Sequence, residues 1–155
     1  MAAPLCADGE TSARRVAMSI QPGKPGAPEE RIELTREDGG CRVSASRTTA
    51  DGAVLEAGHA ELEPAVCRTF WRRLGGLGLD DFEAVERPDP TDDFGSMAIV
   101  LDWEVGNGVR TRRWDWTRPL VDARPADALA ALLARHARRE IPNVPLAYFP
   151  EPSAE

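Results

Sequence analysis

Four arginines and two tryptophans occupy the ten residues 110–119, which read RTRRWDWTRP. Guanidinium groups bind carboxylates and phosphates, and indole rings stack on cations and bases, so this composition is typical of a contact surface. The chain as a whole carries a formal net charge of −7, whereas affinity for nucleic acid depends on neutralising phosphates. We therefore expect no nucleic-acid partner, and we expect Arg110, Arg112 and Arg118 to contact another protein.

A serine and a histidine are predicted to be neighbours on adjacent strands. The Asp-Gly pair at 51–52 is a hairpin signature, because both residues tolerate the positive φ of a two-residue turn. Counting outward from it places Ser44 opposite His59, which is half of a nucleophile–base pair. No nucleophile elbow surrounds Ser44, and the nearest acid, Glu61, is already paired with an arginine in this register. We predict two polar residues on a solvated sheet face and no catalytic residue.

Metal ligands are sparse in this sequence. The carboxylates at Glu83, Glu86, Asp89, Asp92 and Asp93 do not follow the spacing of an EF-hand loop, and prolines interrupt them. His136 has only Glu140 as a possible second ligand four residues away, a metal needs more ligands, and no CxxC or Cys/His cluster occurs. We predict no metal site and no cofactor. The odd, sparse set of cysteines is typical of a reducing compartment, which favours a cytoplasmic location; these are Cys6, Cys41 and Cys67.

Alternating apolar residues predict strands around residues 16–20 and 32–34, followed by two strands flanking the Asp-Gly turn. In that hairpin Cys41, Val43 and Ala45 form a dry face, and the alternate residues form a wet face. Residues 97–117 predict a second hairpin. A turn at Asn107-Gly108 alone pairs Leu101 with Trp114, whereas a three-residue turn would set charges against the apolar row, so we choose the first register.

Two helices complete the predicted elements. One begins at Pro64, buries residues at i, i+3, i+4 and i+7, and ends at Gly75-Gly76, where glycine accepts the left-handed conformation. Its buried residues are Cys67, Phe70, Trp71 and Leu74. The other begins near Pro125 and carries Arg138 and Arg139 in its last turn, which suits the helix dipole. Its buried stripe is Leu129, Leu132, Leu133 and His136.

The order of these elements predicts an α+β fold, with a single antiparallel sheet of about six strands (order ββββ-α-ββ-α) and two helices packed on one face. We expect a disordered segment at 1–13, one domain at 14–140 and a proline-rich tail at 141–155. In the tail, Tyr148 and Phe149 lie among prolines, and they either strap the tail across the domain or dock on a partner. We keep both aromatics as candidate binding residues.

No P-loop, GxGxxG fingerprint, HExxH motif or kinase motif set occurs, and no run of about 18 apolar residues could span a membrane. The composition indicates a GC-rich bacterial genome. The acidic balance favours a non-enzymatic protein-interaction module, such as an accessory subunit, adaptor or toxin-neutralising protein, which binds another, basic protein through its sheet face or tail. The alternative is a small-molecule-binding or hydrolase-like domain with a pocket between helices and sheet. Its lining would be Trp71, Trp103 and the arginines at the open end of the second hairpin. Oligomeric state stays open.

Overall fold

A computed structural model of the chain describes residues 13–22, 26–37, 40–79, 82–86, 98–105, 110–116 and 120–150, without the side chains of 13, 14, 37, 98–105 and 110–112. The described strands are β1 (Ala13–Gln21), β2 (Glu29–Glu37), β3 (Gly40–Thr48), β4 (Val54–Leu62), β5 (Ala98–Val105) and β6 (Arg110–Trp116). The described helices are α1 (Pro64–Gly75) and α2 (Arg124–Glu140). Neither helix has the length and apolar character that crossing a bilayer would need.

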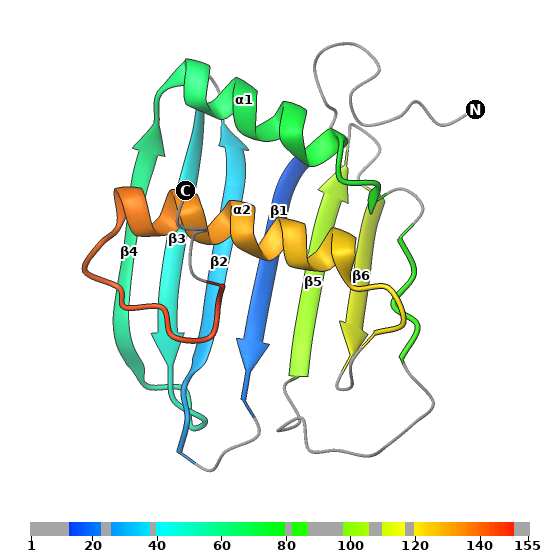
Figure 1. The fold of residues 1–155 in the computed structure, drawn as a ribbon. Helices are drawn as coiled ribbons and strands as arrows, with labels where there is room; N and C mark the ends of the chain where they lie inside the picture. The colour runs from blue at the N-terminus through cyan, green and yellow to red at the C-terminus, as the bar shows by residue number, and fades with distance from the viewer. Residues whose placement is uncertain are drawn as a thin grey trace.

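The described strands form a six-stranded sheet in the order β4-β3-β2-β1-β5-β6, and every neighbouring pair is antiparallel. Both helices lie across the same face of this sheet, and α2 crosses nearly all of the strands (Figure 1). The expected α+β class, with an antiparallel sheet and two helices, is confirmed. We call the sheet face under the helices the covered face and the other the open face.

The first hairpin has the predicted register over most of its length. Cys41 pairs with Leu62 and Ser44 pairs with His59, but Thr48 pairs with Val54, not with Leu55 as the two-residue turn required. The reason lies in the loop. The backbone N–H of Thr49 donates to the carbonyl of Ala53 (2.8 Å), and Gly52 has φ of 94°. A longer loop that ends in a left-handed glycine therefore replaces the predicted turn and shifts the register by one residue.

The second hairpin has the predicted register throughout: Leu101 pairs with Trp114, and Ile99 pairs with Trp116. The side chains of Trp114 and Trp116 are buried, as expected for core residues. The indole N–H of Trp114 donates to the backbone carbonyl of Phe82 (3.2 Å), which satisfies the polar end of a ring that is otherwise in an apolar environment.

Helix α1 begins with Pro64 and buries the four predicted side chains. Its end differs in detail from the prediction: Gly76 is right-handed (φ −86°), and Gly78 takes the positive φ of 81°. Helix α2 buries the predicted leucines and His136 against the same core. Since the buried side chains of both helices and of the covered face form one apolar cluster, the described part of the chain has one core.

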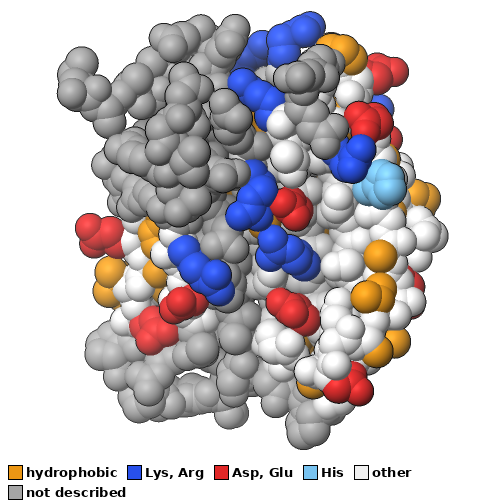
Figure 2. Space-filling view, turned by 180° about the vertical axis from the view of Figure 1, so that it is seen from behind, with side chains coloured by type: hydrophobic (Ala, Val, Ile, Leu, Met, Phe, Trp, Pro, Cys, Tyr) orange, Lys and Arg blue, Asp and Glu red, His pale blue; other side chains and the backbone are white. Residues whose placement is uncertain are grey.

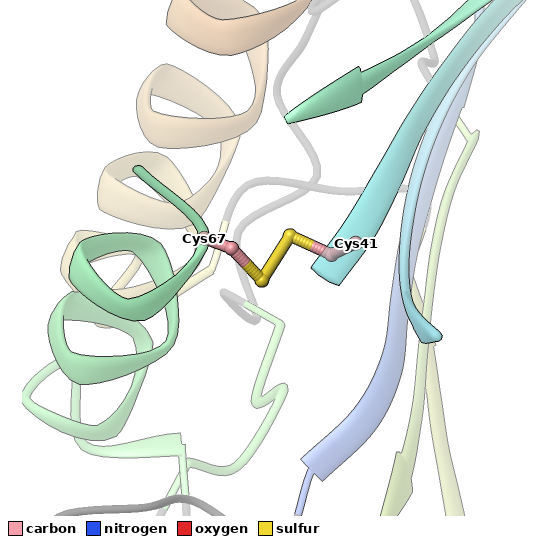
Figure 3. Close-up of a disulfide and its surroundings, with 2 residues drawn as sticks. All are labelled: Cys41 and Cys67. Atoms are coloured by element: carbon pink, nitrogen blue, oxygen red, sulfur yellow. A yellow bond between two sulfur atoms is a disulfide. The ribbon is translucent and has the colours of Figure 1, made fainter. Parts of the chain in front are cut away.

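A disulfide joins Cys41, near the start of β3, to Cys67 in α1, with 5.9 Å between the two Cα atoms (Figure 3). The interpretation of the cysteines as a reduced set is therefore wrong for this pair. The sequence contained a usable sign. The hairpin register sets Cys41 beside Leu62 on the covered face, and a helix that starts two residues later folds back over that face, bringing Cys67 above Cys41.

Candidate functional site

The open face is organised in rows of residues that cross four strands. Strand pairing aligns residues of β1, β2, β3 and β4 laterally, and alternation along each strand keeps these residues on one face. One row is Ser19, Arg31, Ser46 and Ala57, the next is Ala17, Glu33, Ser44 and His59, and the third is Arg15, Thr35, Arg42 and Glu61. Over β1 to β4 the described part of this face is therefore mostly polar, and Figure 2 shows charged side chains of both signs among those that are coloured.

Ion pairs and hydrogen bonds hold the long side chains of these rows in place. Arg15 Nη1 lies 3.2 Å from Glu33 Oε2. Arg31 Nη1 donates to Ser19 Oγ (3.0 Å), and its Nη2 lies 3.7 Å from Glu33 Oε1. Glu33 thus bridges two arginines, although its side chain stays 29 % exposed. Pairs with this exposure contribute at most about 1 kcal/mol each to stability, so their main effect is to order the surface.

A hollow of about 340 Å³ opens on this face above β3. Its floor is made of small side chains, Ser44 and Ser46, while Arg31 and Glu33 on β2 and His59 on β4 stand at its sides. Hydroxyl, guanidinium, carboxylate and imidazole groups together offer both donors and acceptors. The hollow can therefore receive a polar side chain or a short polar segment from outside.

The hollow does not have the geometry of a nucleophilic active site. The structure confirms that Ser44 and His59 are cross-strand neighbours. Glu33, however, lies on the far side of Ser44 from His59, so the row reads acid, serine, histidine, whereas a triad needs the acid next to the histidine. Glu61, the next acid on β4, is paired with Arg42 at 3.2 Å. Among the described residues no hydrogen bond joins Ser44 to His59.

The arginine candidates can be placed only in part. Arg110 and Arg112 lie on the edge strand β6, where they pair with Val105 and Trp103, and their side chains are outside the described set. The side chain of Trp103 is also outside the described set. Arg118 lies outside the described residues. These positions therefore stay predictions.

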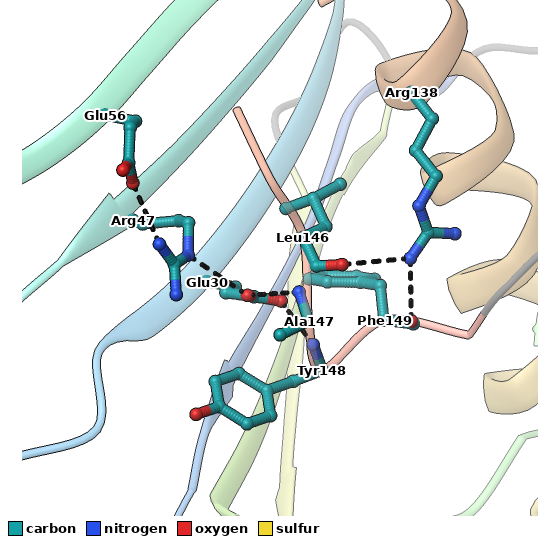
Figure 4. Close-up of polar contacts among 8 residues, drawn as sticks. All are labelled: Glu30, Arg47, Glu56, Arg138, Leu146, Ala147, Tyr148 and Phe149. Carbon is teal, nitrogen blue, oxygen red and sulfur yellow. Dashed lines mark hydrogen bonds and ion pairs between the residues drawn. The ribbon is translucent and has the colours of Figure 1, made fainter. Parts of the chain in front are cut away.

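The tail residues take unequal positions. Phe149 is 2 % exposed and belongs to the core, while Tyr148 packs against the core and is half-buried. The backbone N–H groups of Ala147 (2.5 Å) and Tyr148 (2.7 Å) donate to the carboxylate of Glu30 (Figure 4). This arrangement has the form of the strap that the sequence left as one of two interpretations.

Glu30 is the residue that sequence reasoning missed. Its side chain is fully buried and also accepts a hydrogen bond from Arg47 Nε (3.3 Å), whose Nη1 reaches Glu56 (3.0 Å). Burial lowers the pKa of Arg47, but the hydrogen bonds and charges of Glu56 and Glu30 outweigh it, so that this pKa is raised. A sign was present: Glu30 shares the apolar face of β2 with Ile32 and Leu34, where a carboxylate needs dedicated partners.

A second clamp holds the other side of the tail. The guanidinium of Arg138, on α2, donates to the carbonyls of Leu146 (3.3 Å), Phe149 (2.9 Å) and Pro150. The arginine thereby satisfies carbonyls that no regular secondary structure pairs. Figure 4 shows the tail held between this guanidinium and the Glu30 carboxylate. In this conformation the tail is an integral part of the folded domain.

The space between helices and sheet is occupied by core side chains at the described positions. Trp71, which the small-molecule alternative placed at a pocket, is 2 % exposed and lies edge-on to Phe70 at 5.0 Å. His136 is edge-on to the same ring at 5.5 Å, and its Nδ1 has no hydrogen-bond partner among the described residues. Burial, followed by the charges of nearby arginines, lowers the pKa of His136. Both rings therefore act as core residues.

The described residues contain no group of three or more His, Cys, Asp and Glu side chains that could hold a metal ion. Of the acidic linker, Glu83 and Glu86 are described, whereas Asp89, Asp92 and Asp93 lie outside the described residues. The strongest candidate site is thus the hollowed open face of β2, β3 and β4. The chain matches no protein-family model, no curated protein and no solved structure.

Proposed function

We propose that this chain is a non-enzymatic protein-interaction module, acting as an accessory subunit, adaptor or toxin-neutralising protein, and that it binds its partner through the open face of the sheet. The observation that carries the proposal is the hollow above Ser44 and Ser46, framed by side chains that ion pairs already order. Pre-ordered side chains lose little conformational entropy on binding, which favours specific association.

The two faces of the sheet have different roles, and this difference supports the proposal. The covered face is committed to the core, and the tail aromatic Phe149 is buried there as well. The described ion pairs of the open face contribute little to stability, because they are partly exposed. The net charge of −7 favours a basic partner through long-range attraction, which falls as salt is added.

A bulky substitution in the hollow tests the proposal. Ser46→Trp fills the space above β3, and Ala131→Trp, on the exposed side of α2, adds the same ring away from the open face. Both variants and the unmodified protein are immobilised and exposed to extract of the native organism, and retained proteins are measured by quantitative mass spectrometry. We expect a stoichiometric partner that the unmodified protein and Ala131→Trp retain and that Ser46→Trp loses by about tenfold or more, which corresponds to about 1.4 kcal/mol.

The thermal unfolding midpoints of both variants are measured first, so that loss of binding is not confused with loss of folding. Equal retention of the partner by Ser46→Trp and the unmodified protein would exclude the open face as the docking surface. If no protein is retained in stoichiometric amount, the interaction hypothesis itself fails.

A further inference from the structure

The Cys41–Cys67 disulfide connects β3, the second strand of the sheet, to the helix α1 that lies over it. Cys41 is fully buried and Cys67 is 6 % exposed, and Figure 3 shows the bond spanning the gap between β3 and α1. The Cα separation of 5.9 Å falls in the range of about 4.4–6.8 Å that a disulfide needs. The two residues are 26 positions apart in the sequence, so the tertiary fold brings them together.

Regular structure fixes both cysteines where they meet. Cys41 is held in β3 by backbone pairing to Arg36 on one side and Leu62 on the other. The N–H of Cys67 donates to the carbonyl of Glu63 (2.9 Å), which closes the first turn of α1. Neither cysteine lies on a mobile loop, so the folded chain keeps their sulfur atoms facing each other. The native fold therefore stabilises the disulfide once an oxidant has reacted with these two thiols.

We propose that this protein folds and acts in an oxidising compartment, outside the reducing cytosol. Stable structural disulfides are typical of exported proteins and are rare where thiol reductants are abundant. The sparse cysteines were one ground for expecting a cytoplasmic location, and this pairing removes that ground. The inference does not depend on the proposed interaction function, although it implies that any partner shares that compartment.

The oxidation step defines the co-reactant. The thiols of Cys41 and Cys67 lose two protons and two electrons as the sulfur–sulfur bond forms. The electrons reduce the disulfide of a thiol–disulfide oxidoreductase, or of a small-molecule disulfide, to two thiols. Because both sulfur positions are buried in the folded chain, this exchange takes place before α1 closes over β3.

Trapping of thiols in cells tests the inference on the full chain. Cells of the native organism are quenched in acid, denatured, and treated with a maleimide carrying a polyethylene glycol mass tag, with and without prior reduction. The chain has three cysteines, so we expect one tag before reduction, on Cys6, and three after it. A chromosomal Cys6→Ser strain is the control, with no tag before reduction and two after it.

Fractionation gives the second readout. The oxidised protein is expected with markers of the extracytosolic fraction, separate from a cytosolic marker enzyme. Three tags without prior reduction would overturn the inference, because they would show reduced thiols in the cell. Oxidised protein in the cytosolic fraction would overturn it equally, since the bond would then form without an oxidising compartment.

Discussion

Replacement of Glu30 by glutamine tests how the tail is held. The carboxylate of Glu30 is fully buried and accepts hydrogen bonds from two tail N–H groups and from Arg47. Glutamine has the same shape but keeps one acceptor oxygen, and its NH₂ group then faces a donor. An unpaired buried N–H costs about 1–3 kcal/mol, and a hydrogen bond to a charged group contributes about 1.5–3 kcal/mol.

These terms together predict that Glu30→Gln lowers the free energy of unfolding by about 3 kcal/mol. For a chain of this size the thermal midpoint should fall by about 9 °C, at about 2–4 °C per kcal/mol. Equilibrium unfolding in urea, followed by tryptophan fluorescence, measures the change as a lower midpoint with an unchanged slope. Hydrogen exchange at the amides of Ala147 and Tyr148 should accelerate in the variant, because both N–H groups donate to this carboxylate.

Glu29→Gln is the matched control, because it makes the same change one residue earlier in β2, at a partly exposed position. A substitution away from buried networks should stay within about 0.5 kcal/mol of the unmodified protein. The reasoning is refuted if the unfolding free energies of Glu30→Gln and Glu29→Gln agree within that margin. Such a result would mean that the buried carboxylate contributes no more than a solvated one.

Three further perturbations have defined outcomes. Gly58→Ala would place a Cβ 2.6 Å from a methyl group of Ile141 in the tail, whereas a Cβ at Gly40 would lie 3.7 Å from its nearest atom. Urea unfolding should therefore show that Gly58→Ala loses about 1–3 kcal/mol of unfolding free energy and that the control Gly40→Ala does not. The pKa of His136 is lowered by burial and then by arginine charges, so the unfolded chain binds more protons than the folded chain as pH falls. The free energy of unfolding should therefore decrease as pH drops below about 6.5, and this decrease should be smaller in His136→Gln. Loss of the Cys41–Cys67 bond, which closes a 26-residue span, should cost about 3.5 kcal/mol in urea unfolding of a double alanine variant.

The registers of both hairpins were predictable because a one-residue slip moves every side chain to the other face. Leu101 opposite Trp114 was fixed in this way. The prediction failed near Thr48, where the hydroxyl of Thr49 bonds within the loop. Local side-chain bonds of this kind compete with the shortest turn and lengthen it. These local bonds set the length of the turn, so the residue types at 51–52 alone were not enough to predict the pairing of Thr48.

The candidate site was predicted only along one hairpin. Counting from the turn brought Ser44 beside His59, as the structure has it. The hollow also needs Arg31 and Glu33, which come from β2. The Asp38-Gly39 pair in the sequence is a turn signal of the same kind, and counting outward from it sets Glu33 opposite Ser44, as the structure has it. Partners distant in sequence, such as Glu30 with the tail N–H groups more than 100 residues later, depend on how the domain closes. No local pattern carries that information.

The alternation along β3 and β4 has a consequence for how this protein can change. Ser44 faces the hollow while Val43, its neighbour in the chain, is buried in the core. Substitutions on opposite faces share no partners, so their effects on free energy should add. Under the proposed function, substitutions can then change binding preference one row at a time while the scaffold keeps its stability. Because the helices cover only one face of the sheet, residues of the covered face determine the fold, and residues of the open face can change without altering it.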